Sequence, residues 1–284
     1  MTLQCHVERP SGGVPAARPL EALESTRVAD SIYAERDGDE GDMVLVTSDG
    51  VVVVDPLNPD FALRLAKELK RLAPGAKLAA IVYSHSHQDH AGGAQVLLDI
   101  FGGNVPIIAG RRTAEHLKER GVPTVVPPSE VVQAPWSRRF GSLTLELLDV
   151  GPNHTDDMLV GWVPEAKTAY LVDFVNNRTC GYRDLPGASL PGYWESIDRV
   201  LAWPIEHVVF GHGAPAGRDA VAENAAYWRA IRARVRRAID AGQSEDDAAR
   251  SIELPAYRDW GMFAEWFPSN VRAAYRFERG DRRR

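Results

Sequence analysis

A short segment of this chain carries four side chains that can bind metal ions. His85, His87, Asp89 and His90 lie within six consecutive positions, directly after the apolar run from Leu78 to Tyr83. Imidazoles two residues apart project to the same side of an extended segment, so His85 and His87 can bind one ion together. The adjacent Asp89 and His90 can turn toward a second position nearby. The segment therefore predicts a metal site that could serve two ions.

Further candidate ligands follow later apolar runs. His154 comes after the alternating stretch 143–150, and His212 comes after the β-branched run 207–210. Asp173 ends another apolar run, where a purely structural strand would have little reason to bury a carboxylate. Each of these residues taken alone could be an ordinary loop or turn residue. Their positions after successive predicted strands favour a role as ligands.

This series of residues resembles the ligand series of the metallo-β-lactamase superfamily, in particular its glyoxalase II and lactonase-like branch. The pattern His-x-His-x-Asp-His at 85–90, followed by His154, Asp173 and His212, supplies all seven ligand positions of that family. The resemblance implies two metal sites bridged by Asp173, one made by His85, His87 and His154, the other by Asp89, His90 and His212. Nitrogen and oxygen ligands without a thiolate suit two zinc ions, with iron or manganese as alternatives.

The resemblance also implies a hydrolytic mechanism. Two ions about 3.5–4 Å apart can share one water and lower its pKa toward ~7, so that a metal-bridging hydroxide attacks the substrate. Asp89 would act as the catalytic proton acceptor and pass the proton to the leaving group. Family members carry an aspartate at the position of Asp55, which steadies the metal loop; an ordinary turn residue is the alternative. Asp157 is a candidate for orienting a ligand imidazole, with helix capping as the alternative.

Signals for the substrate are weaker than those for the metal. Aromatic residues in the last part of the chain, and in loops predicted near the metal face, could line an apolar pocket. The candidates are Trp136, Tyr182, Trp194, Trp260 and Phe263. Packing of the last helices explains the C-terminal aromatics equally well. These residues favour a fairly apolar small molecule with an ester, lactone or thioester bond.

Other activities stay open at this point. The carboxylate at position 173 disfavours a β-lactam hydrolase, because the resemblance implies a cysteine or no bridging ligand there in such enzymes. A mononuclear-iron oxidoreductase resembling persulfide dioxygenases would use only two histidines and an aspartate. A scaffold that binds a ligand without turnover is a third alternative, disfavoured by the intact ligand series.

The pattern of apolar residues favours an α/β (α+β) fold. Period-2 runs predict strands near 31–34, 43–47, 51–55, 78–83, 105–109, 130–133, 143–150, 158–162, 168–172 and 207–210. Helical spacing predicts helices over 58–72, 92–101, 113–119, 193–202 and 220–241, followed by a helical, aromatic tail. The resemblance implies that these elements form a four-layer αββα sandwich. We predict an irregular N-terminal arm over 1–28 and a single domain over 29–284.

Composition limits the kinds of partner. The chain has 284 residues and a net charge of −6, whereas nucleic-acid surfaces usually need a basic stripe. The sequence contains no apolar run near eighteen residues, and its first thirty residues lack the apolar core of a signal peptide. We therefore expect a cytoplasmic enzyme with a small-molecule substrate and with neither a nucleic-acid nor a membrane partner. Homo-oligomerisation stays open.

Overall fold

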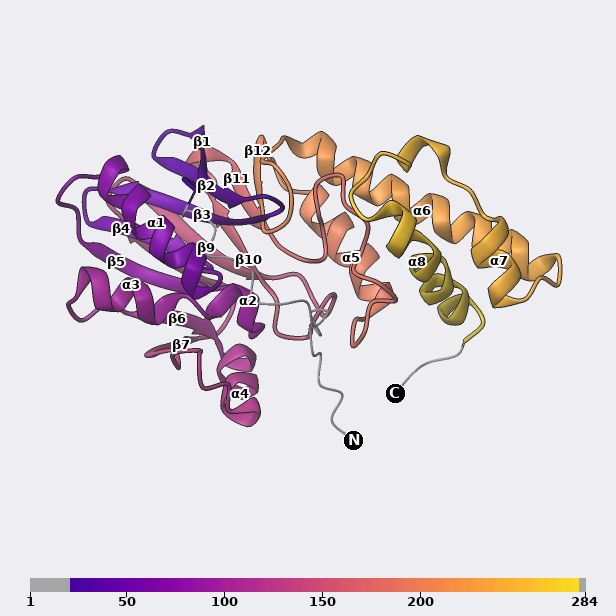
Figure 1. Cartoon of the computed structure of the whole chain (residues 1–284), viewed down its shortest axis with the longest axis horizontal. Helices are drawn as coiled ribbons and strands as arrows, with labels where there is room; N and C mark the ends of the chain where they lie inside the picture. Colours follow the sequence, from indigo (N-terminus) through magenta and orange to yellow (C-terminus); the bar gives the residue numbers. More distant parts are fainter. Residues whose placement is uncertain (1–20, 281–284) are drawn as a thin grey trace.

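Two β-sheets pack face to face, with helices on their outer sides (Figure 1), in the computed structural model, which describes residues 21–280. The first sheet has seven strands in chain order: β1 Glu24–Ala29, β2 Ile32–Asp37, β3 Glu40–Thr47, β4 Gly50–Val54, β5 Leu78–Tyr83, β6 Ile107–Gly110 and β7 Glu130–Val132. The strands β1 to β4 are antiparallel neighbours, and β4 to β7 are parallel.

The second sheet has five strands in reverse chain order. Its strands are β12 His207–Phe210, β11 Thr168–Leu171, β10 Leu159–Val163, β9 Leu143–Asp149 and β8 Trp136–Phe140. Only the pair β11 and β12 is parallel. The carboxyl ends of parallel strands meet at one edge of a sheet, so residues that follow β11 and β12 lie close together.

Eight α-helices surround the sheets within the described residues. They are α1 Pro59–Leu72, α2 Gln88–Ala91, α3 Ala94–Phe101, α4 Arg111–Arg120, α5 Leu190–Leu201, α6 Arg218–Asp240, α7 Glu245–Ser251 and α8 Phe263–Glu278. The helix α1 begins as its sequence predicts, because the Asn58 side chain accepts a hydrogen bond from the Phe61 N–H and Pro59 occupies the first turn. Among the helices of residues 21–280, none combines the length and the apolar character needed to cross a bilayer.

The apolar core has two parts. One part lies between the sheets and joins residues such as Met43 and Val82 of the first sheet to Leu145 and Tyr170 of the second. The other lies between the first sheet and the helices α1 and α3, where Phe61 packs with its neighbours. In Figure 1 the helices α6, α7 and α8 extend to the side away from the seven-stranded sheet. The predicted arrangement of two packed sheets with outer helices is thereby confirmed.

Two local expectations were wrong. The segment Glu24–Ala29 was predicted to be part of an irregular arm, but it pairs with β2 as an edge strand; residues 1–20 lie outside the described part of the chain. Trp136 was predicted to lie in a loop, but it begins the edge strand β8, which pairs with β9. The segment after His87 was predicted to turn toward a second position, and Gln88–Ala91 do form one helical turn, so Asp89 and His90 do not continue the alternation of His85 and His87.

The first sheet contains an unusual pair of buried carboxyl groups. Glu35 on β2 and Asp42 on β3 are cross-strand neighbours, and both are fully buried. Ser25 donates a hydrogen bond to one oxygen of Glu35, whereas the other oxygen and both oxygens of Asp42 have no hydrogen-bond partner within residues 21–280. Burial raises the pKa of Glu35 from 4.5 to about 7 and that of Asp42 well above its usual value.

This pair should make stability depend on pH. A carboxyl group with a raised pKa in the folded state stays protonated while the unfolded chain ionises, so wild-type stability falls as the pH rises from 4.5 to about 7. We expect Glu35→Gln to lose less stability than the wild type between pH ~5 and pH ~8, by about 1–3 kcal/mol, in chemical denaturation. Glu68→Gln is the control, because Arg71 lowers the pKa of Glu68. If Glu35→Gln and the wild type lose equal stability over this pH range, the raised pKa of Glu35 is contradicted.

Candidate metal centre

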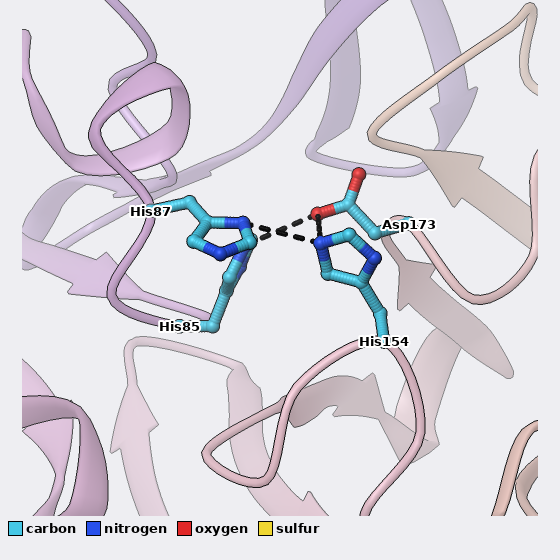
Figure 2. Close-up of side chains that lie close together, drawn as sticks. All are labelled: His85, His87, His154 and Asp173. Atoms are coloured by element: carbon cyan, nitrogen blue, oxygen red, sulfur yellow. Dashed lines mark hydrogen bonds and ion pairs between the residues drawn. The ribbon is translucent and has the colours of Figure 1, made fainter. Parts of the chain in front are cut away.

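The predicted ligands come together where the loops after parallel strands meet. The strand β5 leads directly into the segment 84–90. The parallel strands β11 and β12 end just before Asp173 and His212. His154 comes from the loop between β9 and β10. Figure 2 shows His85, His87, His154 and Asp173 pointing toward one another.

Two groups of possible ligands share one carboxylate. His85, His87, His154 and Asp173 form one group, and His90, Asp173 and His212 form the other; within each group the ligand atoms lie within 4.8 Å of one another. The Asp173 Oδ2 atom is 3.1 Å from His85 Nε2, 3.4 Å from His154 Nε2 and 3.5 Å from His90 Nε2, while Oδ1 is 2.9 Å from His212 Nε2. The two ring nitrogens His154 Nε2 and His87 Nδ1 are 3.1 Å apart. The centre of the arrangement is therefore Asp173.

The chemistry of these atoms fits a bound cation. Within residues 21–280, His85 Nε2, both ring nitrogens of His90 and Asp173 Oδ2 are buried without a hydrogen-bond partner. The Ser84 hydroxyl donates its single proton to Asp55 and therefore accepts from the Nδ1–H of His85, 2.9 Å away. The Nε2 lone pair of His85 then faces a carboxylate oxygen. Two acceptors at that distance are stable only with a positive charge between them, and divalent metal ions are the cations that imidazole and carboxylate groups bind.

The pKa values of the histidines differ between the two groups of candidate ligands. Burial lowers the pKa of His87 to about 3 and that of His154 to about 4, so both imidazoles are neutral at pH 7 and can offer lone pairs. Burial also opposes a charge on His212, but the contacts with Asp173 and Asp39 raise its pKa to about 10. A metal ion at His212 would therefore displace a proton.

A buried network holds the start of the metal loop. Asp55 Oδ1 accepts a hydrogen bond from the Ser84 N–H at 2.7 Å, and Oδ2 accepts from the Ser84 hydroxyl at 2.6 Å. The Tyr170 hydroxyl lies 3.0 Å from the same Oδ2, and His90 Nδ1 lies 3.4 Å from it. Asp55 thus contacts both the metal loop and a candidate ligand, at the position that the sequence suggested.

Two more carboxylates support the loops from outside. Asp157 Oδ2 accepts a hydrogen bond from the Ser86 N–H at 2.8 Å, so it binds the backbone between His85 and His87 rather than an imidazole. Asp39, in the turn between β2 and β3, places Oδ2 at 3.6 Å from His212 Nδ1. A carboxylate beside a ligand imidazole, as Asp39 is beside His212, orients the ring and fixes its tautomer.

Sequence reasoning did not identify several of these supporting residues. Asp39, Ser84, Tyr170 and Tyr193 contact candidate ligands or their supporting groups, and the Tyr193 hydroxyl donates to the Asp173 carbonyl oxygen. Ser84 adjoins the metal motif and could have been found there. The others lie far from it along the chain and carry no local signal.

Asp89 lies apart from both groups. Its side chain is 62% exposed on α2, and its Oδ2 atom is 3.9 Å from His90 Nε2. The carboxylate is within reach of the second group but does not belong to it, since His90, Asp173 and His212 form that group alone. This position suits a group that exchanges protons with solvent.

A third group of possible ligands connects α4 to the loop after His154. His116 Nε2 lies 2.6 Å from Asp156 Oδ1, and Arg112 lies 3.1 Å from Asp156 Oδ2. The Thr113 hydroxyl donates to the Asp157 carbonyl oxygen. Arg112 already neutralises Asp156, so these contacts attach α4 to the loop and do not define another metal site.

The candidate pocket residues lie in different surroundings. Trp136 begins β8, although a loop was expected there, and Trp194 lies on α5, within the helix predicted over 193–202. Tyr182 packs edge-on against Trp266, with ring centroids 5.2 Å apart, and Phe263 stacks on Phe267 at 4.5 Å. Trp260 is only 4% exposed and packs on Tyr227 among the C-terminal helices.

Two surface cavities lie along α6. The larger, of about 310 Å³, is lined by residues from Arg234 to Glu253. The smaller, of about 80 Å³, is lined by Trp194, Trp228 and Arg232 among others. Neither cavity is lined by a candidate metal ligand. Because the candidate ligands meet around Asp173, we place the functional site at those groups and not at the larger cavity.

Comparison with known proteins identifies the family. The family model described as metallo-beta-lactamase superfamily matches residues 36–212, which include all seven candidate ligands. The chain is 28% identical over 184 residues to a metallo-beta-lactamase type 2 of Bacillus cereus, covering 62% of this chain and 68% of that protein. It is 30% identical over 138 residues to a hydroxyacylglutathione hydrolase of Erythrobacter litoralis, covering 49% of each. The chain thus spans about half of that hydrolase.

Solved structures support the same fold. A metallo-beta-lactamase from Pontibacter korlensis superposes with a TM-score of 0.63 at 20% identity, over 72% of this chain and 97% of that chain. The sec-alkylsulfatase Pisa1 from a Pseudomonas species superposes with a TM-score of 0.71 at 18% identity, over 90% of this chain and 50% of that chain.

The chain belongs to the metallo-β-lactamase superfamily, because the family model covers more than half of it. Members of this superfamily are typically metal-dependent hydrolases, and the cluster of histidines around Asp173 suits divalent metal ions.

The cluster generates a prediction about stability. We expect Zn²⁺ added to metal-free protein to raise the free energy of unfolding, by about 2.7 kcal/mol at one hundred times the dissociation constant. His87→Ala should gain clearly less at the same zinc concentration, because it lacks a ligand of the first group. His207→Ala, a histidine outside both groups, is the control and should match the wild type. Denaturant titrations with and without zinc measure the difference, and equal gains in all three proteins would exclude His87 as a ligand.

Proposed function

We propose that this protein is a dinuclear metal-dependent hydrolase that cleaves an ester, lactone or thioester bond in a fairly apolar small molecule. The observation that carries this proposal is the sharing of Asp173 by two groups of histidines, in which several buried ligand atoms have no hydrogen-bond partner within residues 21–280. If only one ion were bound, at the first group, His90 and His212 would bind no metal. We further propose that both ions are zinc, since the ligands are nitrogen and oxygen atoms of borderline character.

The seven residues take distinct roles in this proposal. One ion would be held by His85, His87 and His154, the other by His90, His212 and Asp89, with Asp173 between them. Such ions, when bound, make a water molecule acidic enough to react at neutral pH and polarise the bond that is attacked. The carboxylate of Asp173 would hold the two groups at one separation. Asp55 and Asp157 would keep the metal loop in place through Ser84 and Ser86.

Asp89 would also move a proton. Its carboxylate lies beside His90 and is open to solvent, so it can accept the proton of the attacking water and deliver it to the leaving oxygen or sulfur. Ser84 contacts His85, but its hydroxyl is buried and donates its proton to Asp55, so it is not placed to act as a nucleophile. The attack on the substrate would therefore come from water.

Two observations support the kind of substrate. The name of the relative from Erythrobacter litoralis says that it hydrolyses hydroxyacylglutathione, which favours an acyl bond as the target. The partly exposed aromatic residues Tyr182, Phe263 and Trp266 could contact an apolar part of the substrate. A cytoplasmic location, and partners limited to small molecules, remain predictions.

A β-lactam hydrolase is the second candidate. The 28% identity to a metallo-beta-lactamase of Bacillus cereus favours it. The carboxylate at position 173 argues against it, because β-lactam hydrolases are expected to have a cysteine or no bridging ligand at that position. A mononuclear-iron oxidoreductase is less favoured, because it would leave the second group of histidines unused.

A substrate panel with two ligand variants tests the proposal. We expect zinc-loaded wild-type protein to hydrolyse lactones, esters or thioesters faster than β-lactams and phosphodiesters. His87→Ala and Asp173→Ala should each lose more than the ~100-fold that residues orienting a ligand contribute, because they remove ligands directly. His207→Ala should retain wild-type activity. If β-lactams are the best substrates, the second candidate is correct; if either ligand variant keeps the wild-type rate, the dinuclear assignment is wrong.

Asp89→Asn separates proton transfer from metal binding. The amide keeps the size of the side chain and an oxygen that can still bind the ion, but it cannot accept a proton at neutral pH. We expect kcat to fall by about 10²- to 10⁴-fold while Zn²⁺ content per chain, measured by elemental analysis, remains that of the wild type. Loss of one zinc ion would show that Asp89 acts chiefly as a ligand, and an unchanged kcat would exclude both roles.

A further inference from the structure

The backbone at Asp173 has an unfavourable conformation. Its φ of 63° lies in the left-handed region, which residues other than glycine rarely adopt. The Phe174 N–H donates to the Val172 carbonyl oxygen at 2.7 Å, which closes a three-residue turn around Asp173. A turn of this type with a positive central φ is rare and strained, so neighbouring groups must hold it.

Tyr193 on α5 holds this turn. Its hydroxyl donates a hydrogen bond to the Asp173 carbonyl oxygen at 3.1 Å. The side chain is only 1% exposed, and its ring packs edge-on against Trp228, with centroids 5.9 Å apart. Because packing fixes the buried ring of Tyr193, its hydroxyl has a fixed position. The hydrogen bond from this hydroxyl therefore restrains the backbone of Asp173.

The same helix holds the loop that carries His154. The Ser189 N–H, at the start of α5, donates to the Asn153 carbonyl oxygen at 2.7 Å. The Asn153 amide donates to the Ser196 hydroxyl at 3.1 Å, and its Oδ1 accepts from the His154 N–H at 2.6 Å. Asn153 and Ser196 are both fully buried.

The contact between helix and loop is too close for any side chain at Gly192. A Cβ atom there would lie 1.5 Å from the Pro152 carbonyl oxygen. The backbone of α5 therefore rests directly on the loop, one turn of helix before Ser196. Two loops that are separate along the chain thus share one rigid support.

We infer that α5 positions the metal centre, with Tyr193 as the positioning residue for Asp173 and Ser196 as the positioning residue for His154. Both candidate ligands are attached to one helix, which sets the distance of 3.4 Å between Asp173 Oδ2 and His154 Nε2. This inference rests on the metal binding in the proposed function, but it requires no particular substrate.

Tyr193→Phe tests the inference, with Tyr227→Phe as the matched control. Both tyrosines are buried, and each donates its hydroxyl to one carbonyl-type oxygen, but the partner of Tyr227 is Asn270, which belongs to neither ligand group. Zinc affinity is measured in the full chain by competition with a chelator, without substrate. The absorption spectrum of the Co²⁺-substituted protein reports ligand geometry, and thermal unfolding of the metal-free protein reports the general cost of each substitution.

We expect Tyr193→Phe to weaken zinc binding by about 3- to 10-fold, the value of one hydrogen bond, and to shift the Co²⁺ spectrum. Tyr227→Phe should lose similar thermal stability with wild-type affinity and spectrum. If Tyr193→Phe binds zinc as the wild type does, or if Tyr227→Phe weakens binding equally, the inference is wrong. Should Tyr193→Phe not fold, Ser196→Ala replaces it, and wild-type zinc affinity in that variant overturns the inference.

These outcomes differ from those of the proposed function. A wild-type protein that binds zinc tightly but cleaves no ester, lactone or thioester would contradict the proposed function and leave the role of α5 intact. A hydrolase whose zinc affinity is unchanged in Tyr193→Phe would contradict the role of α5 and leave the proposed function intact.

Discussion

The structure depends on burying the carboxylate of Asp173 among four histidines. A buried charge without compensation is costly, yet the side chain keeps its charge: burial opposes ionisation, but the surrounding imidazoles hold the pKa of Asp173 well below its usual value. His85, His90, His154 and His212 all approach its two oxygens. The histidines are in turn close enough to repel one another when protonated. Divalent cations between the carboxylate and neutral imidazoles satisfy both constraints.

The fold supplies the supports that this concentration of groups needs. The two sheets direct the loops after β5, β11 and β12 to a common region, since these strands belong to the parallel parts of their sheets. The loops themselves are irregular, and each is held by hydrogen bonds from a rigid element: Asp55 after β4 holds the metal loop, and α5 holds the loops of His154 and Asp173. Strain at Asp55 and Asp173, both with positive φ, is a local cost that these contacts offset.

The aromatic residues that we propose for substrate contact belong to neither group of candidate ligands. The aromatic residues of the C-terminal region divide between packing and exposure, since Trp260 is buried against Tyr227 whereas Tyr182 and Trp266 remain partly exposed. Family membership defines the metal chemistry through residues 36–212, and the C-terminal helices α7 and α8 lie beyond that region. Differences in substrate among relatives with the same ligands are therefore expected to arise in such surrounding segments.

The sequence by itself determined the series of candidate ligands and its order along the chain, because strand ends and the spacing of His85 to His90 are local properties. It also predicted most strands and helices, for which apolar periodicity suffices. Only the tertiary structure decided the pairing of the edge strands β1 and β8, whose sequences alternate weakly. The supporting roles of Asp39, Tyr170 and Tyr193 were also decided only by the tertiary structure, because each residue contacts another that is far away in the chain. No local sequence pattern marks these residues. The structure also decided that Asp89 lies apart from both groups of ligands, because the helical turn α2 directs it away from them.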